Sequence, residues 1–342
     1  METTTPSTLD QHELREGMLP IIRRPRRNRS SAAWRGLITE SHLRASQLVY
    51  PVFATEGPCV QIPSMPGIFR LALEDLFEEI EETLSLGIQA INLFCHIPDH
   101  KKDPVGSEAY RPDSLLPTSI REIKKRFPEL LVIADIALDP FTSHGLDGLV
   151  NEHMYVVNDP TLVALGHMSL RAAEAGVDLI SPSDMMDGRV AYLRQLLDTH
   201  GFCRVGILSY AVKFASSLYS PFREALDSSP RSGDKKTFQV NPANAREALL
   251  ECALDDQECA DMLLIKPAIT SLDIIAKVRS QTLLPIGAYQ VSGEYAMIKA
   301  AATNGWINGE EVLMESLIAI RRAGADFIFT YAAKEAAGLL KK

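Results

Sequence analysis

The chain has 342 residues, of which 46% are hydrophobic and 23% are charged, and its formal net charge is −9. This acidic balance argues against a general nucleic-acid binder, and no apolar run approaches the roughly 20 residues of a membrane-spanning helix. The five cysteines include no C-x-x-C pair, which argues against a disulfide framework or a structural zinc site and favours a reducing cytoplasm.

Residues 1–45 are predicted to form an N-terminal arm. They are polar, basic and weakly patterned, and the opening residues lack the apolar stretch of a signal peptide. The segment contains a run of arginines at Arg23, Arg24, Arg26, Arg27 and Arg29. Such a run is usually solvated, but on an acidic chain it also fits docking against an acidic neighbouring subunit. Three apolar residues, Trp34, Leu37 and Ile38, offer anchors for such a contact.

Beyond the arm, short apolar runs alternate with longer helical patterns. The candidate strands are Val49–Phe53, Ala90–His96, Leu131–Leu138, Val177–Pro182, Arg204–Tyr210, Asp261–Pro267, Leu284–Gln290 and Asp326–Tyr331. Most are continuous apolar runs, as expected for a parallel sheet that is buried on both faces. The candidate helices are Leu73–Leu86, Thr161–Ala175, Val190–His200, Ala243–Ala260, Ser271–Gln281 and Glu311–Ala323.

Eight strands alternating with helices predict an α/β fold, a closed (β/α)8 TIM barrel over residues 46–342 with an extended N-terminal arm. The length also suits such a barrel, which takes about 250 residues plus insertions. An open doubly wound sheet is the alternative. No G-x-G-x-x-G follows the first strand, so we expect no dinucleotide and no other organic cofactor.

Polar residues follow most of the predicted strands. In a βα-barrel, the carboxyl ends of the strands meet at one mouth, where the active site lies. Taken singly, each of these residues is more simply explained as a helix cap or a loop residue, but together with Lys213 and Lys266 they converge from six strands, which favours a site. They are Asp135, Asp139, His144, Asp147, Ser183, Asp184, Ser209, Tyr210, Tyr289, Ser292, Thr330 and Tyr331.

Two lysines stand out because they lie in apolar runs. Lys213 follows the fifth predicted strand and Lys266 ends the sixth, whereas most lysines lie on the surface. Neighbouring strands would bring the two amines together, and each ammonium group would then disfavour protonation of the other. A lysine pKa would fall from about 10.4 toward neutrality, leaving a free amine that attacks ketones to form an imine.

The connection 213–239 is long, rich in serine, and carries Arg223, Lys235, Lys236 and Gln239. A solvated loop is the simpler interpretation. A lid with cationic groups that clamp a substrate carboxylate is the functional one.

Several longer motifs carry a family resemblance. They are SMPG at 64–67, KKDPVGSEAY at 101–110, SPSDMMDGRV at 181–190, SYAVKFASSLYSPFREA at 209–225, LIKP at 264–267 and YQVSGEYAMIKAA at 289–301. With them the chain resembles the porphobilinogen synthase (5-aminolevulinate dehydratase) family over nearly its whole length. The resemblance implies a βα-barrel with an N-terminal arm, and it implies a homo-oligomer, most simply an octamer. The implied reaction joins two 5-aminolevulinate molecules, with loss of two waters, into porphobilinogen for haem and other tetrapyrroles.

The resemblance also implies roles for individual residues. Lys266 would hold the substrate that becomes the propionate half of the product, and Lys213 the one that becomes the acetate half. The second substrate's carboxylate would be clamped by Arg223, Lys235 and Gln239, and the first substrate's carboxylate would be bound by Ser292 and Tyr331. Asp135 and Ser183 would lie beside the amino group of the first substrate. The aromatic walls of the site would be formed by Tyr219, Phe222 and Tyr289.

The metal preference depends on the segment 135–148. Zinc-dependent members of the family carry three cysteines at the positions of Ala137, Asp139 and Asp147, whereas carboxylates prefer a hard cation or none. The resemblance therefore implies a member without active-site zinc, in which Glu258 holds an allosteric Mg²⁺ at a subunit interface. Two residues depart from the family pattern, because Cys259 and Ala268 replace usual glycines.

Two other readings remain open at this stage. One is a different Schiff-base barrel enzyme such as an aldolase, which needs a single catalytic lysine and usually a phosphate site. The other is a catalytically silent barrel that acts as a scaffold, although both lysines are intact.

Overall fold

The computed structural model describes residues 21–231 and 233–341. It divides into a segment that ends at Ser41 and a unit that spans His42–Lys342. In the first segment, the 3-10 turn η1 (Pro25–Arg29) precedes helix α2 (Ala32–Leu37), and Ser31 caps α2 by accepting a hydrogen bond from the Trp34 backbone N–H. None of residues 21–40 is buried. The rest of the predicted arm, residues 1–20, lies outside the described residues.

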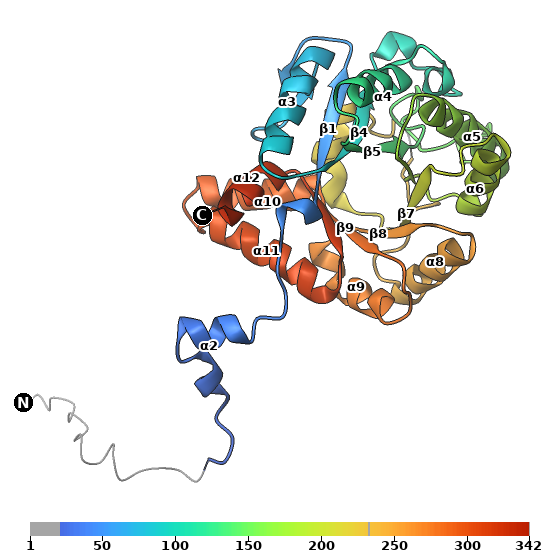
Figure 1. Cartoon of the computed structure of the whole chain (residues 1–342). Coiled ribbons are helices and arrows are strands. Elements are labelled where there is room, and N and C mark those ends of the chain that lie inside the picture. Colours follow the sequence, from blue (N-terminus) through green and yellow to red (C-terminus); the bar gives the residue numbers. More distant parts are fainter. Residues whose placement is uncertain (1–20, 232, 342) are drawn as a thin grey trace, which may run out of the picture. The chain divides into compact units, whose positions relative to one another are not determined.

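The unit His42–Lys342 is a closed barrel of eight parallel strands, as Figure 1 shows. The strands are β1 (Leu48–Thr55), β4 (Ala90–His96), β5 (Leu131–Ile136), β6 (Leu179–Pro182), β7 (Gly206–Lys213), β8 (Met262–Lys266), β9 (Ile286–Gln290) and β10 (Phe327–Thr330). Each strand pairs with the next, and β10 pairs with β1 to close the ring. The predicted TIM barrel is confirmed, and the open sheet is excluded. A small hairpin, β2 (Val60–Gln61) and β3 (Phe69–Leu71), is attached to β1.

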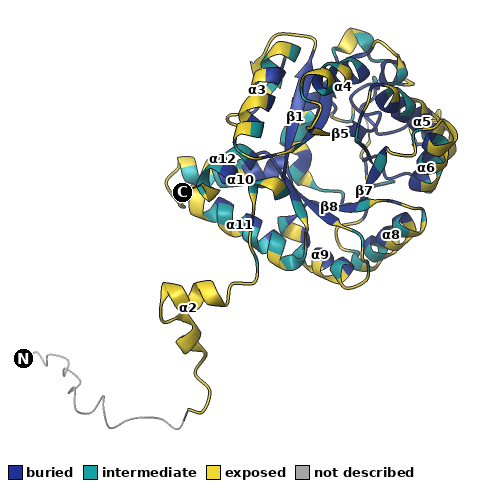
Figure 2. Cartoon of the chain, viewed as in Figure 1, coloured by how far each residue is buried: buried dark blue, intermediate teal, exposed yellow. Residues whose placement is uncertain are grey.

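Helices surround the barrel, and their outer faces are exposed while the strands are buried (Figure 2). They are α3 (Leu73–Ser85), α4 (Leu115–Arg126), α5 (Asn158–Glu174), α6 (Arg189–Thr199), α8 (Ala245–Gln257), α9 (Leu272–Arg279), α10 (Ser292–Thr303), α11 (Gly309–Ala323) and α12 (Ala333–Leu340). A shorter helix, α7 (Ser220–Leu226), lies in the long connection after β7. Short 3-10 turns are η2 (Ala45–Gln47), η3 (Asp99–Lys101), η4 (Ser107–Tyr110), η5 (Ser217–Tyr219) and η6 (Ile269–Ser271).

All six predicted helices are present, but α2, α4, α7, α10 and α12 were not predicted. Helix α10 is rich in alanine and shows no clear apolar stripe in the sequence, whereas α4 has an apolar face of Leu116, Ile120 and Ile123 that sequence reasoning overlooked. In the described part of the chain, every helix is too short or too polar to cross a bilayer.

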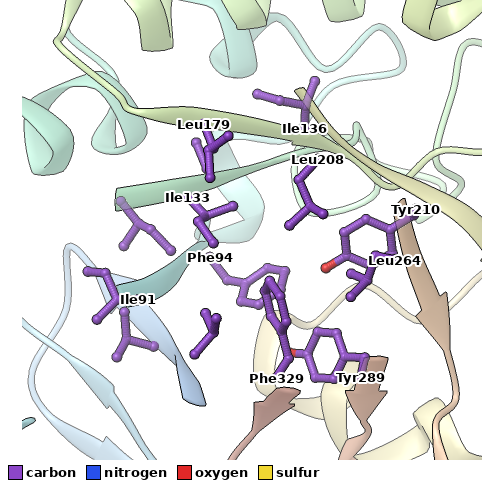
Figure 3. Close-up of a cluster of buried hydrophobic side chains, with 14 of the residues drawn as sticks. Ile91, Phe94, Ile133, Ile136, Leu179, Leu208, Tyr210, Leu264, Tyr289 and Phe329 are labelled. Atoms are coloured by element: carbon purple, nitrogen blue, oxygen red, sulfur yellow. The ribbon is translucent and has the colours of Figure 1, made fainter. Parts of the chain in front are cut away.

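The barrel interior changes in character along its axis (Figure 3). Early positions of the strands contribute aliphatic side chains such as Ile91 and Ile133, whereas later positions contribute aromatic ones. Tyr289 packs on Phe329 with ring centroids 5.2 Å apart. The aliphatic layer supplies burial energy, and the aromatic layer forms the floor beneath the carboxyl ends of the strands.

Strand β7 contains a bulge that sets the register of the two lysines. Ser209 pairs with Leu263, but after a shift of register Val212 pairs with Ile265 and Lys213 with Lys266. One extra residue on β7 therefore separates these pairs. Tyr210 points into the barrel (Figure 3), and strict alternation would turn a side chain three residues later to the outside. The bulge is what lets Lys213 face the same mouth as Lys266.

We predict that Cys259→Gly stabilises the protein. Cys259 follows the last turn of α8 with φ of +71°, a left-handed conformation that favours glycine. Removing this strain should raise the free energy of unfolding by about 0.5–1 kcal/mol, after the entropic cost of glycine in the unfolded chain. Urea denaturation measures the change. Cys259→Ser, which removes the thiol but keeps a Cβ, should give no gain, and an equal gain from both variants would contradict the backbone explanation.

Candidate active site

The carboxyl ends of β7 and β8 place the two lysines side by side as register partners. Both side chains are buried, with 7% of Lys213 and 4% of Lys266 exposed. A buried lysine without a partner is rare, because transfer of the ammonium group from water is costly. The two amines differ in how the surrounding protein meets this cost.

Lys266 is enclosed by aromatic rings. Its Nζ lies 4.6 Å from the ring centroid of Tyr289, 4.8 Å from that of Phe222, and 5.0 Å from that of Tyr219. These ring faces attract a cation, but burial and the positive charge of Lys213 oppose protonation more strongly. They lower the pKa of Lys266 to about 7. The Lys266 amine therefore loses its proton far more readily than an ordinary lysine.

Lys213 lies in an ion pair instead. Its Nζ donates a hydrogen bond to Asp147 Oδ1 at 2.9 Å and another to the backbone carbonyl of Ser183. Two neighbouring lysines were expected to lower each other's pKa, and this effect is seen at Lys266. Lys213 differs because the Asp147 carboxylate lies beside its ammonium group.

Asp147 also pairs with a lysine from the connection after β7. Lys235 Nζ lies 2.7 Å from Asp147 Oδ2 and 3.0 Å from Asp139 Oδ2. Asp147 is completely buried, and although burial opposes its ionisation, Lys213 and Lys235 lower its pKa to about 2. The pKa of Lys235 is raised, because the two carboxylates outweigh burial. Two lysines and two aspartates thus form a buried network without net charge.

Asp135 is the third carboxyl group of this segment and behaves differently. Burial and the charge of Asp139 raise its pKa to about 7, against the opposing effect of the two site lysines. Its Oδ1 has no hydrogen-bond partner in the described part of the chain. Asp135 can therefore give or take a proton near neutral pH.

Ser292 and Tyr331 reach the same mouth from β9 and β10 but bond to other groups. Tyr331 accepts a hydrogen bond from the Tyr289 hydroxyl at 3.0 Å. Ser292 Oγ accepts from the Phe222 backbone N–H at 3.0 Å and donates to the Leu218 carbonyl at 3.2 Å. Ser292 thereby contacts the backbone of Phe222, whose ring lies 4.8 Å from the Lys266 amine, and Tyr331 contacts Tyr289, whose ring lies 4.6 Å from the same amine.

The connection after β7 forms a pocket with a volume of about 380 Å³, lined by Arg223, Lys235, Lys236 and Gln239 together with several serines. Within residues 21–231 and 233–341, the Arg223 guanidinium has no hydrogen-bond or ion-pair partner. The Gln239 side chain is buried, and its Oε1 is unpaired in the same described region. Of the three predicted clamp residues, Lys235 is already bound by Asp139 and Asp147. Arg223 and Gln239 are the two that can still bond to a ligand.

The positions relevant to metal binding separate into two places. Ala137 is buried beside the paired Asp139 and Asp147, whose oxygens face ammonium groups. Glu258 lies at the C-terminal end of α8, where its Oε2 accepts a hydrogen bond from the Ala191 backbone N–H at 3.2 Å. Among the residues that the structure describes, no group of three or more His, Cys, Asp or Glu side chains could hold a metal ion.

Sequence reasoning missed a buried arginine beneath the site. Arg189 is 2% exposed and binds Asp255 Oδ2 at 3.0 Å, Ser209 Oγ at 3.1 Å and the Tyr210 carbonyl at 3.1 Å. It thereby ties the bulge of β7 to α8. The only available signal was its place in the SPSDMMDGRV motif, because the helical pattern after Gly188 suggests an exposed first turn.

The lid connection is also tied to the first half of the barrel in a way that was not predicted. Arg70 Nε donates to the Ala225 carbonyl at 2.7 Å, and Lys102 Nζ donates to the Asp227 carbonyl at 2.7 Å. Both cations bind carbonyls at the C-terminal end of α7, one in its last turn and one in the residue that follows it, where positive charge is favoured. Basic residues more than a hundred positions away from α7 gave no local signal of this contact.

Comparisons with known proteins point to one family. A family model described as delta-aminolevulinic acid dehydratase matches residues 22–339. A chloroplastic delta-aminolevulinic acid dehydratase from Glycine max is 51% identical over 94% of this chain and 79% of its own length. The enzyme of that name from Chlamydia pneumoniae is 50% identical over 92% of this chain and 95% of its own length. A solved structure from Toxoplasma gondii, bound to the product porphobilinogen, superposes with a TM-score of 0.93 at 49% identity and covers 94% of this chain and 92% of that one.

We predict that Asp147→Asn lowers the free energy of unfolding by about 3 kcal/mol at pH 7, because two buried ammonium groups lose their shared partner. The folded pKa of Asp147, about 2, lies below the unfolded value of about 3.9. This stabilisation is therefore present above pH 4 and is lost as the pH falls toward 2. In urea denaturation, the difference in unfolding free energy between wild type and variant should be the same at pH 7 and pH 5 and smaller at pH 3.

Asp234→Asn is the matched control, because Asp234 is exposed and pairs with the exposed Lys236 of the same connection. It should leave the urea midpoint unchanged. An equal effect of both variants would mean that the charge of Asp147 is not specifically compensated by Lys213 and Lys235.

Proposed function

The chain belongs to the delta-aminolevulinic acid dehydratase family, and from that premise we infer that it is a porphobilinogen synthase. It is a lyase of porphyrin biosynthesis that condenses two 5-aminolevulinate molecules into porphobilinogen. The structural observation that carries this function is the Lys266 amine, which is buried among aromatic rings with a pKa of about 7 beside a second lysine. Family membership leaves the aldolase and scaffold readings without support.

We propose that Lys266 forms the first covalent bond. Its neutral amine would add to the ketone of one 5-aminolevulinate, and the resulting carbinolamine would lose water to give an imine. Lys266 has no carboxylate hydrogen-bond partner among the described residues, whereas Lys213 is held by Asp147. The free amine is therefore available first at Lys266. Asp135, with a pKa of about 7, is suited to accept or return the protons of these steps.

The second substrate would react at Lys213 and place its carboxylate in the pocket of the connection after β7. Arg223 and Gln239 have free bonding capacity there, and charge-assisted hydrogen bonds to a carboxylate are stronger than neutral ones. The first substrate's carboxylate would be bound by Ser292 and Tyr331. Tyr219, Phe222 and Tyr289 wall the Lys266 amine and exclude water from the imine.

The oxygens of Asp139 and Asp147 already face ammonium groups, and Ala137 offers no ligand atom, so these residues do not form a zinc site. Glu258 supplies one half-buried carboxylate, which suits Mg²⁺ because that ion binds one or two carboxylates and keeps several waters. We propose that Mg²⁺ binds at Glu258 and acts through assembly of the homo-oligomer, most simply an octamer.

We propose that the protein acts in the cytoplasm. All five cysteines are free thiols, which suits a reducing environment. The word chloroplastic belongs to the name of the Glycine max relative and describes that protein.

Reductive trapping tests the covalent step. With 5-aminolevulinate and cyanoborohydride, substrate should become attached to Lys266, and Lys266→Ala should abolish turnover. Because the reactive form is the neutral amine and its pKa is about 7, the labelling rate should rise about tenfold per pH unit below 6.5 and level off above 8. Mass spectrometry locates the label.

The same experiment on Lys213→Ala checks the electrostatic explanation. Loss of the neighbouring positive charge should move the midpoint of labelling at Lys266 to higher pH. A midpoint that stays in place, or turnover that persists in Lys266→Ala, would contradict the proposed mechanism.

The metal proposal predicts that a zinc-selective chelator leaves activity intact, while added Mg²⁺ stimulates turnover or favours a larger oligomer. Glu258→Gln keeps an oxygen for the Ala191 N–H but removes the charge, so it should abolish the Mg²⁺ response while turnover without Mg²⁺ stays measurable. Glu174→Gln, in an exposed pair with Arg171, is the control. Activity lost to the chelator and restored by stoichiometric zinc would overturn the proposal.

The assembly proposal predicts that a chain lacking residues 1–41 forms smaller oligomers with lower activity. The deletion should stop at Ser41, because Leu43 is buried in the core of the barrel unit. Sedimentation velocity measures the size distribution. Trp34→Ser, which removes an exposed apolar anchor, should shift the distribution in the same direction. Unchanged sedimentation and activity of the shortened chain would refute a role in assembly.

A further inference from the structure

Glu294 is a buried acid that the reaction described above does not use. It is the third residue of α10, and none of its surface is exposed. Glutamate at this helix position usually faces water, as Glu311 does at the third position of α11. Glu294 is buried where the first turn of α10 meets the loop that follows β8.

The two carboxylate oxygens of Glu294 bind two different chain segments. Oε2 accepts a hydrogen bond from the Val291 backbone N–H at 2.6 Å, which is the ordinary capping contact of a helix start. Oε1 accepts from the Ile269 backbone N–H at 2.7 Å. Ile269 lies three residues after Lys266, so this second bond joins the start of α10 to the loop that carries the reactive lysine.

Packing alone does not account for this side chain. In the part of the chain that the structure describes, no cation pairs with Glu294, and burial raises its pKa to about 7 although several backbone N–H groups act in the other direction. Burying a carboxyl group is costly, and an apolar residue would fill the space more cheaply. The compensation is geometric, because one rigid carboxyl group fixes two backbone segments at once.

The two residues before Glu294 fix a third segment. Ser292 binds the Phe222 N–H and the Leu218 carbonyl. A side chain at Gly293 would place its Cβ 2.5 Å from the Leu218 carbonyl oxygen, so only glycine allows this approach. The first turn of α10 is therefore the point where the loop after β8 and the turn before α7 are joined.

We propose that Glu294 is a positioning residue that sets the separation between the Lys266 amine and the Ser292 hydroxyl. The inference rests on the proposed function, since it takes Lys266 as the imine-forming lysine and Ser292 as a ligand of the same substrate's carboxylate. Glu294 touches neither ketone nor carboxylate. It holds the backbone from which each partner group projects, so that one substrate can meet both groups together.

Two ketones of similar size test this separation. The neutral Lys266 amine adds to either ketone, water leaves, and cyanoborohydride reduces the imine to a stable secondary amine. 4-Oxopentanoate must reach both Lys266 and the carboxylate-binding hydroxyl, whereas pentan-2-one needs Lys266 alone. Any change in their spacing should therefore weaken trapping of the first ketone and spare the second.

Glu294→Asp is the most informative variant. Aspartate still suits the third helix position and can cap Val291, but it is one methylene too short to keep the bond to Ile269. The half-saturating concentration of 4-oxopentanoate should rise about tenfold, with pentan-2-one unchanged. Glu294→Gln, which keeps the length but replaces one acceptor by a donor, should give the same difference. Glu311→Asp is the matched control at an exposed helix position and should change neither value.

The outcomes separate this inference from the function on which it rests. Wild-type values for both ketones in folded Glu294→Asp and Glu294→Gln would overturn the positioning role while leaving the imine chemistry intact. An equal loss for both ketones would also overturn it, because Glu294 would then act on Lys266 itself. Failure of wild-type enzyme to be labelled at Lys266 by either ketone would overturn the proposed function and this inference together.

Discussion

The chemistry of the site depends on one completely buried carboxylate, Asp147, which lies between two ammonium groups. Lys213 and Lys235 approach its two oxygens at 2.9 and 2.7 Å, and Asp139 balances the remaining charge. Without this network, two cations would lie in the same water-poor pocket, and each would have to lose its proton or leave. The network therefore gives Lys213 a carboxylate partner, whereas the buried Lys266 amine beside it has a lowered pKa.

The difference between the two lysines follows from their neighbours. Lys213 has a carboxylate within hydrogen-bond distance, whereas Lys266 has aromatic rings and a positive neighbour. Chemically identical side chains on adjacent strands thus receive different electrostatic surroundings. This asymmetry matches a reaction that must treat two identical substrate molecules differently, because one molecule becomes the propionate half of the product and the other becomes the acetate half.

Sequence reasoning found the features that repeat along the chain and missed those that depend on distant pairing. The eight strands could be predicted because strands buried on both faces are continuous apolar runs. Lys213 and Lys266 could be placed together because consecutive parallel strands are neighbours. Lys235, by contrast, is 96 residues away from Asp139, and no local pattern shows that it pairs with the aspartates instead of remaining free in the lid. Helix α10 was missed because its alanines give no contrast between faces.

The bulge in β7 carries a consequence for how such a site can originate. The second amine faces the mouth because one residue interrupts the alternation between Ser209 and Val212. In an uninterrupted strand, the same lysine would point toward the surrounding helices and would never meet Lys266. A two-amine site can therefore arise from a one-amine barrel through insertion of a single codon, with no new lysine required. Deletion of that codon would turn the second amine away from the site, although the codon for the lysine itself would remain in the gene.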